Sequence, residues 1–246
     1  MIRIMNSRGF ETFQCKEQIE LSALVFDLDD TLYPEIDYVR SGFTVISGLL
    51  ESLYGLKEED CYKELMETFD KGIRGKNFNA FLDERGLDYS EDIIVELVGA
   101  YREHKPKIAL PEVSKRTLVS LREKGFKLGL LTDGFLEAQK KKVESLGLES
   151  FFDAIVYSDM LGKESWKPSA IPFVEITRML EVSGKECGYI ADNPEKDFKG
   201  AKECGMLAIQ TVHWARRDCA SVPEAYRPDI VIDSLEILPK LVCYSR

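Results

Sequence analysis

Long apolar runs and clustered metal ligands are both missing from this chain of 246 residues. No stretch approaches the roughly 20 consecutive apolar residues that a membrane-spanning helix needs, so we expect no membrane partner. The six cysteines include no CxxC pair, and the two histidines, His104 and His213, lie far apart in the sequence. A metal site built from a local Cys or His motif is therefore not expected, and reduced thiols in a cytoplasmic protein are the simplest interpretation.

An excess of positive charge is missing as well. The chain has 33 Lys and Arg residues against 43 Asp and Glu residues, which gives a formal net charge of −10. Such an acidic protein has no general attraction to nucleic acid or to anionic membranes, so we expect neither as a partner. A chain of this length can bury a sizeable core and fits one domain with an insertion or two unequal domains. We expect a monomer or a homodimer.

The first twenty residues, 1–20, carry charges at both ends and contain no apolar core of signal-peptide length, so export is not expected. Two structures stay open for this N-terminal extension. Ile2 to Met5 could add an edge strand to a sheet, or the whole segment could be a mobile arm. The sequence does not choose between them, and it assigns the extension no function.

The stretch from Ala23 to Glu35, ALVFDLDDTLYPE, places acidic residues directly after a short apolar run. Ala23 to Phe26 has the pattern of a buried parallel strand, and ligands bind beyond the carboxyl ends of such strands. Asp27 and Asp29 are two residues apart, so in an extended chain they point to the same side. Their repulsion raises the pKa of one carboxylate or requires a cation between them. The alternative is a solvated turn.

Between Tyr33 and Lys107 the apolar residues recur at helical spacing, as Val39, Phe43 and Ile46 illustrate. Glycines divide the segment, which predicts several short helices over residues 33–107. Within it, the glycines of the Gly72–Lys76 stretch could present Arg74 and Lys76 to an anionic substrate. The alternative is that these bases are simply solvated.

From Pro111 onward, helical and strand patterns alternate. We expect helices at Glu112–Lys124, Phe135–Leu146 and Ala170–Leu180, and strands at Lys127–Thr132, Asp153–Tyr157, Cys187–Ala191, Met206–Val212 and Asp229–Ile232. This alternation predicts an α/β fold, with a parallel sheet covered by helices on both faces. The core would comprise residues 21–32 and 108–246, and residues 33–107 would be a helical insertion. Asp27, Thr132 and Asp192 each fall at or just past the end of an expected strand, so they should face one crevice together with Lys167.

Four stretches resemble, in order, the motifs of haloacid dehalogenase superfamily phosphatases. They are FDLDDTLYP from Phe26 to Pro34, the triplet Thr132, Asp133 and Gly134, the pair Lys167 and Pro168, and YIADNPEKDFKGA from Tyr189 to Ala201, which contains Asp192 and Asp197. The resemblance spans most of the chain from Ala23 to Asp233. It implies a Rossmann-like core, and it implies that the helical insertion is the C1 cap that closes over the catalytic site in this superfamily.

The resemblance also implies roles for individual residues. Asp27 would be the nucleophile that forms an aspartyl-phosphate, and Asp29 would be the general acid and then the general base. The substrate phosphate would be bound by Thr132, Asp133, Gly134 and Lys167. The metal would be held by Asp27, Asp29 (through its backbone carbonyl), Asp192 and Asp197, although a direct bond from Asp197 stays open. An all-oxygen ligand set suits Mg²⁺, so Mg²⁺ is the expected cofactor.

The function predicted in this way is that of an enzyme, a Mg²⁺-dependent hydrolase of phosphoric monoesters. Its substrate would be a small phosphorylated metabolite: a sugar phosphate, a nucleoside monophosphate or a phosphoglycolate-like acid. A dehalogenase of the same superfamily would have no need of Asp29 or of the acidic fourth motif, so these residues argue against that alternative. A phosphomutase or phosphotransferase of the same superfamily stays open, since it would share the core machinery. A non-catalytic binding or regulatory module is the third alternative, because a fold alone never establishes activity.

Overall fold

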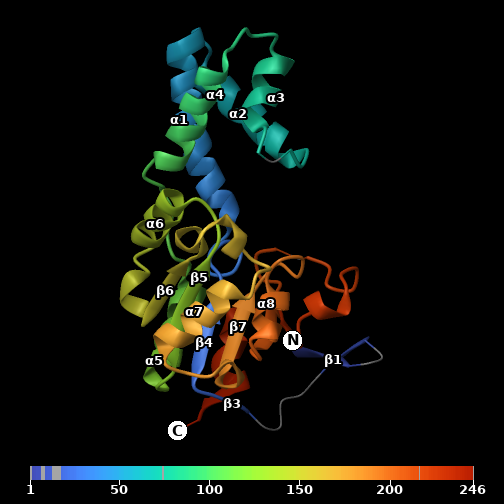
Figure 1. The fold of residues 1–246 in the computed structure, drawn as a ribbon. Coiled ribbons are helices and arrows are strands. Elements are labelled where there is room, and N and C mark those ends of the chain that lie inside the picture. Colours follow the sequence, from blue (N-terminus) through green and yellow to red (C-terminus); the bar gives the residue numbers. More distant parts are fainter. Residues whose placement is uncertain (1, 7–8, 13–17, 74, 216, 246) are drawn as a thin grey trace. The chain divides into compact units, whose positions relative to one another are not determined.

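The computed structural model describes residues 2–6, 9–12, 18–73, 75–215 and 217–245. The chain divides into two compact units (Figure 1). The core unit comprises Met1–Pro34, Ala109–Gln139 and Leu146–Arg246. The helical unit comprises Glu35–Ile108 and Lys140–Ser145. Within the described part of the chain, no helix is long and apolar enough to cross a membrane.

The core unit is built on an eight-stranded sheet with the order β2-β1-β9-β8-β7-β4-β5-β6. Six neighbouring strands run parallel: β4 (Ala23–Phe26), β5 (Lys127–Thr132), β6 (Ala154–Tyr157), β7 (Cys187–Ala191), β8 (Leu207–Thr211) and β9 (Ile230–Ile232). The central strand β4 is fully buried over its whole length, as the apolar run in the sequence predicts for a strand covered on both faces.

Two further strands at the amino end extend the sheet. β1 (Ile2–Asn6) pairs antiparallel with β9, and β2 (Gly9–Thr12) pairs antiparallel with β1. The N-terminal extension therefore does add a strand to the sheet at Ile2 to Met5, but this strand is not at the edge, because β2 lies outside it. A separate two-stranded parallel sheet joins β3 (Ile19–Leu21) to β10 (Val242–Tyr244), which the sequence patterns did not predict.

Helices cover both faces of the large sheet (Figure 1). They are α5 (Glu112–Glu123), α7 (Ile171–Leu180), α8 (Phe198–Glu203) and α9 (Leu238–Leu241). Helix α6 (Leu136–Ser145) begins in the core unit and ends in the helical unit. Short 3-10 segments connect them: η1 (Glu149–Phe151), η2 (Ser158–Leu161), η3 (Lys163–Ser165), η4 (Gly184–Glu186), η5 (Glu224–Tyr226) and η6 (Leu235–Ile237). The predicted α/β architecture, a parallel sheet with helices on both faces, is confirmed, and the expected element ends differ from the observed ones by only one or two residues.

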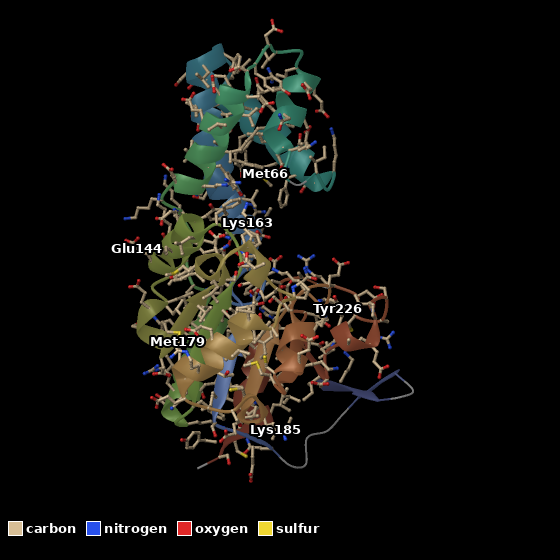
Figure 2. The ribbon with its side chains drawn as sticks, viewed as in Figure 1. Met66, Glu144, Lys163, Met179, Lys185 and Tyr226 are labelled. Atoms are coloured by element: carbon tan, nitrogen blue, oxygen red, sulfur yellow. The ribbon has the colours of Figure 1, made fainter. Side chains whose placement is uncertain are left out.

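The core on one face of the sheet shows how α7 is held. Phe173 and Ile176 of this helix are fully buried and belong to the same apolar cluster as Val25 of β4 and Tyr189 of β7. The side chain of Met179, by contrast, is 43% exposed on the outer side of the helix (Figure 2). The ring centroids of Phe173 and Tyr189 lie 4.8 Å apart in an edge-to-face contact, which fixes the Tyr189 ring beneath the carboxyl end of the sheet.

The helical unit contains α1 (Glu35–Tyr54), α2 (Glu58–Asp70), α3 (Asn77–Glu84) and α4 (Glu91–Glu103). Its core is formed by the apolar positions that the helical spacing picks out, such as Phe43, Ile46 and Leu50 of α1, which pack with Leu97 of α4. In the Gly72–Lys76 stretch, Lys76 is exposed, and Arg74 lies outside the described residues.

Two glycines of α1 allow a matched test of packing in the helical unit. A Cβ atom on Gly42 would lie 2.3 Å from the ring of Tyr101, whereas a Cβ atom on Gly48 would meet no described atom within 4 Å. We expect Gly42→Ala to lower the free energy of unfolding by about 1–3 kcal/mol through overpacking. Gly48→Ala should raise it by about 0.5–1 kcal/mol, because glycine is a poor helix former.

Urea denaturation followed by circular dichroism measures both effects. Equal effects of the two substitutions would contradict the close packing of Tyr101 against α1.

Candidate active site

The carboxyl ends of three adjacent strands carry the acidic and polar groups. β4 lies between β5 and β7 in the sheet, with Phe26 opposite Leu130 on one side and opposite Ile190 on the other. Asp27 directly follows β4, Thr132 ends β5, and Asp192 directly follows β7. Parallel pairing in this register therefore brings together side chains that are separated by as many as 165 positions in the sequence, which is the difference between 192 and 27.

A buried lysine lies at the centre of this group. The Nζ atom of Lys167 donates hydrogen bonds to Asp27 Oδ1 and to Asp197 Oδ1, both at 2.6 Å, and to the Tyr189 hydroxyl at 3.0 Å. The side chains of the lysine and of both carboxylates are at most 2% exposed. One ammonium group thus compensates two buried carboxylates, as buried charges require.

The charges of this cluster follow from burial and pairing. Burial alone would lower the pKa of Lys167, but the nearby Asp197 and Asp27 carboxylates raise it well above its usual value, so the lysine stays protonated. Burial would raise the pKa of Asp197, but the attraction of Lys167 outweighs it and holds the pKa below its usual value. Burial raises the pKa of Asp27, and Lys167 only partly offsets this.

Tyr189 completes the hydrogen bonds of the cluster. Its hydroxyl accepts from Lys167 and donates to Asp197 Oδ1 at 3.2 Å. Burial, together with the Asp197 charge, raises the pKa of this phenol well above its usual value, so it remains a neutral donor. The sequence patterns place Tyr189 only in a strand, because its role depends on which residues lie across from it.

Three carboxylates could hold a cation. Asp27, Asp192 and Asp197 are all buried, and one oxygen atom of each lies within 4.8 Å of the others. Burial and the Asp197 and Asp27 charges raise the pKa of Asp192 to about 7, although Arg217 opposes this. Carboxylate oxygens crowded in this way are the ligands that hard divalent cations prefer. The residues present therefore fit a divalent metal, and that these three acids bind one stays a prediction.

The remaining predicted site residues surround this cluster. The carboxylate of Asp29 accepts hydrogen bonds from the Tyr33 hydroxyl and from Gln139 rather than joining the three acids. Its predicted contact with the metal, through the backbone carbonyl, stays a prediction. The Thr132 hydroxyl donates a hydrogen bond to Gln139 Oε1 at 3.2 Å.

Asp133 and Gly134 shape the loop that follows β5. Asp133 Oδ2 accepts a hydrogen bond from the backbone N–H of Lys167 at 3.0 Å, so the carboxylate anchors the chain beside the buried lysine. Gly134 has a φ of 128°, a backbone conformation that residues with a side chain rarely adopt. The predicted phosphate contact of these two residues would then come from backbone amides of this loop, because the Asp133 carboxylate is held against the lysine loop.

Two further residues contact the acidic cluster and were missed in the sequence. Arg217 Nε donates to Asp192 Oδ2 at 2.6 Å. Gln210 is fully buried, and its Nε2 donates to the backbone carbonyls of both Asp192 and Arg217 at 3.0 Å. The sequence could have indicated Gln210, because it is a polar residue inside the apolar strand LAIQT and buried polar groups need hydrogen-bond partners. Arg217 lies in a loop and offered none.

The sequence is similar to that of known phosphatases. The family model for "haloacid dehalogenase-like hydrolase" matches residues 21–205. A glyceraldehyde 3-phosphate phosphatase from Methanopyrus kandleri is 33% identical over 87% of this chain and 93% of its own. Human N-acylneuraminate-9-phosphatase is 27% identical over 89% of this chain and 93% of its own.

Solved structures show the same fold. The crystal structure of a phosphatase from Thermococcus onnurineus has a TM-score of 0.58 at 24% identity and covers 90% of this chain and 97% of its own. The structure of 2-haloacid dehalogenase from Pseudomonas syringae has a TM-score of 0.61 at 23% identity and covers 91% of this chain and 98% of its own.

Removing the central lysine tests the electrostatic account of the cluster. Lys167→Met would leave two buried carboxylates without their cation, so we expect a loss of about 3–5 kcal/mol in the free energy of unfolding near neutral pH. Without the ammonium, the folded pKa values of both acids would lie above their unfolded values. Their protonation stabilises the fold at low pH, and this stability is lost as the pH rises through the folded pKa values.

The loss caused by Lys167→Met should therefore be larger at about pH 8 than at about pH 5 when urea titrations are compared at the two values. Tyr189→Phe is the matched control, because it removes only a neutral hydroxyl and should cost about 1 kcal/mol. A loss that does not depend on pH would argue against uncompensated carboxylates.

Proposed function

Because the chain belongs to the haloacid dehalogenase-like hydrolase family and is a hydrolase of phosphoric monoesters, we propose that its substrate is a small sugar phosphate and its cofactor Mg²⁺. Several relatives are named glyceraldehyde 3-phosphate phosphatase, which makes a triose phosphate the first substrate to test. The observation that carries the proposal is the buried cluster in which Lys167 joins Asp27 and Asp197. We further propose a cytoplasmic protein, monomeric or homodimeric.

The proposed domain organisation follows the family. Residues 21–32 and 108–246 would form the catalytic core, residues 33–107 the C1 cap inserted in it, and residues 1–20 an extension. The division into a core unit and a helical unit supports this proposal.

Asp27 supplies the nucleophile in this proposal. One of its carboxylate oxygens attacks phosphorus, and the bond from phosphorus to the substrate's alcohol oxygen breaks. Asp29 gives a proton to the departing alcohol oxygen. Water then attacks the phosphorus of the aspartyl-phosphate and loses a proton to Asp29, while the bond from phosphorus to the Asp27 oxygen breaks and the carboxylate is restored. The sum is phosphate monoester plus water giving alcohol plus phosphate. The position of Asp29 two residues beyond Asp27 supports both proton transfers.

The groups that would position the phosphate are a positive charge and uncharged hydrogen-bond donors. The Lys167 ammonium lies 2.6 Å from Asp27, so a phosphate joined to that carboxylate would meet a fixed positive charge. Thr132 and the backbone after β5 supply uncharged donors. Asp27, Asp192 and Asp197, with the backbone carbonyl of Asp29, would hold Mg²⁺, which when bound would offset the negative charge of phosphate and carboxylates.

The first test measures phosphate release from a panel of phosphorylated metabolites, with Mg²⁺ and with a chelator. We expect release from triose or other sugar phosphates, dependent on the metal. Asp27→Asn should lower turnover on the order of 10³-fold or more, because it removes the nucleophile. Asp70→Asn is the control, because this aspartate is exposed on α2 in the helical unit and should leave turnover unchanged.

Near wild-type turnover in folded Asp27→Asn protein would refute the mechanism. Transfer of phosphate to a second hydroxyl of the same sugar, in place of release, would favour the phosphomutase alternative.

The metal site has its own test in thermal unfolding. The pKa of Asp192 is raised to about 7, so in the metal-free protein its proton stabilises the fold fully below about pH 4, and that stability is lost as the pH rises through about 7. Mg²⁺ binds the ionised carboxylate and competes with this proton. We therefore expect MgCl₂ to raise the melting temperature more at about pH 8 than at about pH 6.

Asp192→Asn is the control for this measurement, and it should reduce the shift at both pH values. A Mg²⁺-induced shift in wild type that is the same at both values would contradict the competition.

A further inference from the structure

The carboxylate of Asp29 is held at both oxygens by buried donors. The Tyr33 hydroxyl donates to Oδ1 at 2.6 Å, and Gln139 Nε2 donates to Oδ2 at 3.2 Å. Tyr33 is fully buried and Gln139 is 5% exposed, so water competes little for either contact. Two donors from different elements therefore fix the orientation of the carboxylate.

The backbone places Tyr33 against Asp29. The carbonyl of Leu28 accepts from the backbone N–H of Leu32 at 3.0 Å, and Asp30 has a φ of 55°, so the chain turns back tightly after Asp29. Residues Asp29 and Tyr33 also form an isolated bridge. The turn is anchored by Leu28 and Leu32, both fully buried. The phenol therefore approaches the carboxylate from a fixed direction.

Gln139 reaches Asp29 from another element. It lies in the first turn of α6, where its backbone N–H bonds to the carbonyl of Phe135 at 3.0 Å. Its Oε1 accepts from the Thr132 hydroxyl at 3.2 Å while its Nε2 donates to Asp29. When Asp29 is ionised, as it is after it has given up its proton, only this orientation of the amide satisfies both neighbours, because an ionised carboxylate can only accept.

Gly134 leaves the space that the glutamine occupies. A Cβ atom at position 134 would lie 2.5 Å from Gln139 Nε2, and its φ of 128° also disfavours a side chain. The loop that follows β5 is thus compatible with the Gln139 contact only when residue 134 is glycine.

We propose that Tyr33 and Gln139 are positioning residues that fix the Asp29 carboxylate for proton transfer to the departing alcohol, and that Gln139 ties this carboxylate to Thr132. The inference rests on the proposed function, in which Asp29 is the acid and base. Proton transfer by a placed side chain is sensitive to geometry, and a displacement of about 1 Å can cost about 10²-fold in rate.

Leaving-group dependence tests this role, because it separates proton donation from stability. An alkyl phosphate such as glycerol 3-phosphate needs a proton on its departing oxygen, whereas 4-nitrophenolate departs without one. We expect Tyr33→Phe and Gln139→Met each to lower kcat/KM for the alkyl phosphate by about 10–100-fold and for 4-nitrophenyl phosphate by less than about 3-fold. The parameter kcat/KM is used because it reports the steps up to departure of the alcohol.

Two variants calibrate the measurement. Asp29→Asn removes the acid itself and should show the same selective loss with a larger magnitude. Tyr226→Phe, in η5 of the core unit, removes a phenol whose ring contacts Lys199 and not Asp29. This variant should leave kcat/KM unchanged for both substrates. Circular dichroism and urea titration establish that each variant is folded.

The outcomes separate the two proposals. Equal losses with both substrates, or no loss with either, in an active enzyme would overturn the positioning role of Tyr33 and Gln139 and leave the proposed function standing. A wild-type protein that releases phosphate from neither substrate nor from any sugar phosphate would overturn the proposed function. A selective loss for the alkyl phosphate supports both.

Discussion

The pairing of one buried ammonium with two buried carboxylates is the constraint on which the rest of the core unit depends. The Lys167 ammonium lowers the pKa of Asp27 and of Asp197 against the effect of burial, and the two carboxylates in turn raise the pKa of the lysine. Each of the three comes from a different segment, and each segment is fixed by other contacts. Asp133 holds the backbone of Lys167, and the Asp197 carboxylate also accepts the backbone N–H of Asn193.

Three buried carboxylates meet in this cluster. Asp192 adds a third carboxylate, and its pKa near 7 shows how unfavourable a further charge is there. Arg217 meets Asp192 from the loop beyond β8 and offsets part of this repulsion. Lys167 and Arg217 thus hold carboxylates whose oxygen atoms fit a divalent cation.

The fold and the central acids could be predicted from the sequence because they depend on local patterns. The apolar run before Asp27 and the alternation of strand and helix placed Asp27, Thr132 and Asp192 at one edge of a parallel sheet, and the motif resemblance added Lys167. Their chemical roles stay predictions. Tyr189, Gln139 and Arg217 could not be found in this way, because each acquires its partner only through tertiary packing. The small sheet of β3 and β10 was missed because three-residue strands carry too little pattern.

The hairpin of β1 and β2 has a consequence for the behaviour of the protein in concentrated solution. A parallel sheet that ended at β9 would present a row of unpaired backbone N–H and C=O groups, which can template pairing with another molecule. Here β1 satisfies that row in antiparallel register, with Arg3 opposite Val231. The amino-terminal hairpin thus moves the sheet edge from β9 to the four-residue strand β2, and an edge strand this short offers another molecule few backbone groups for pairing.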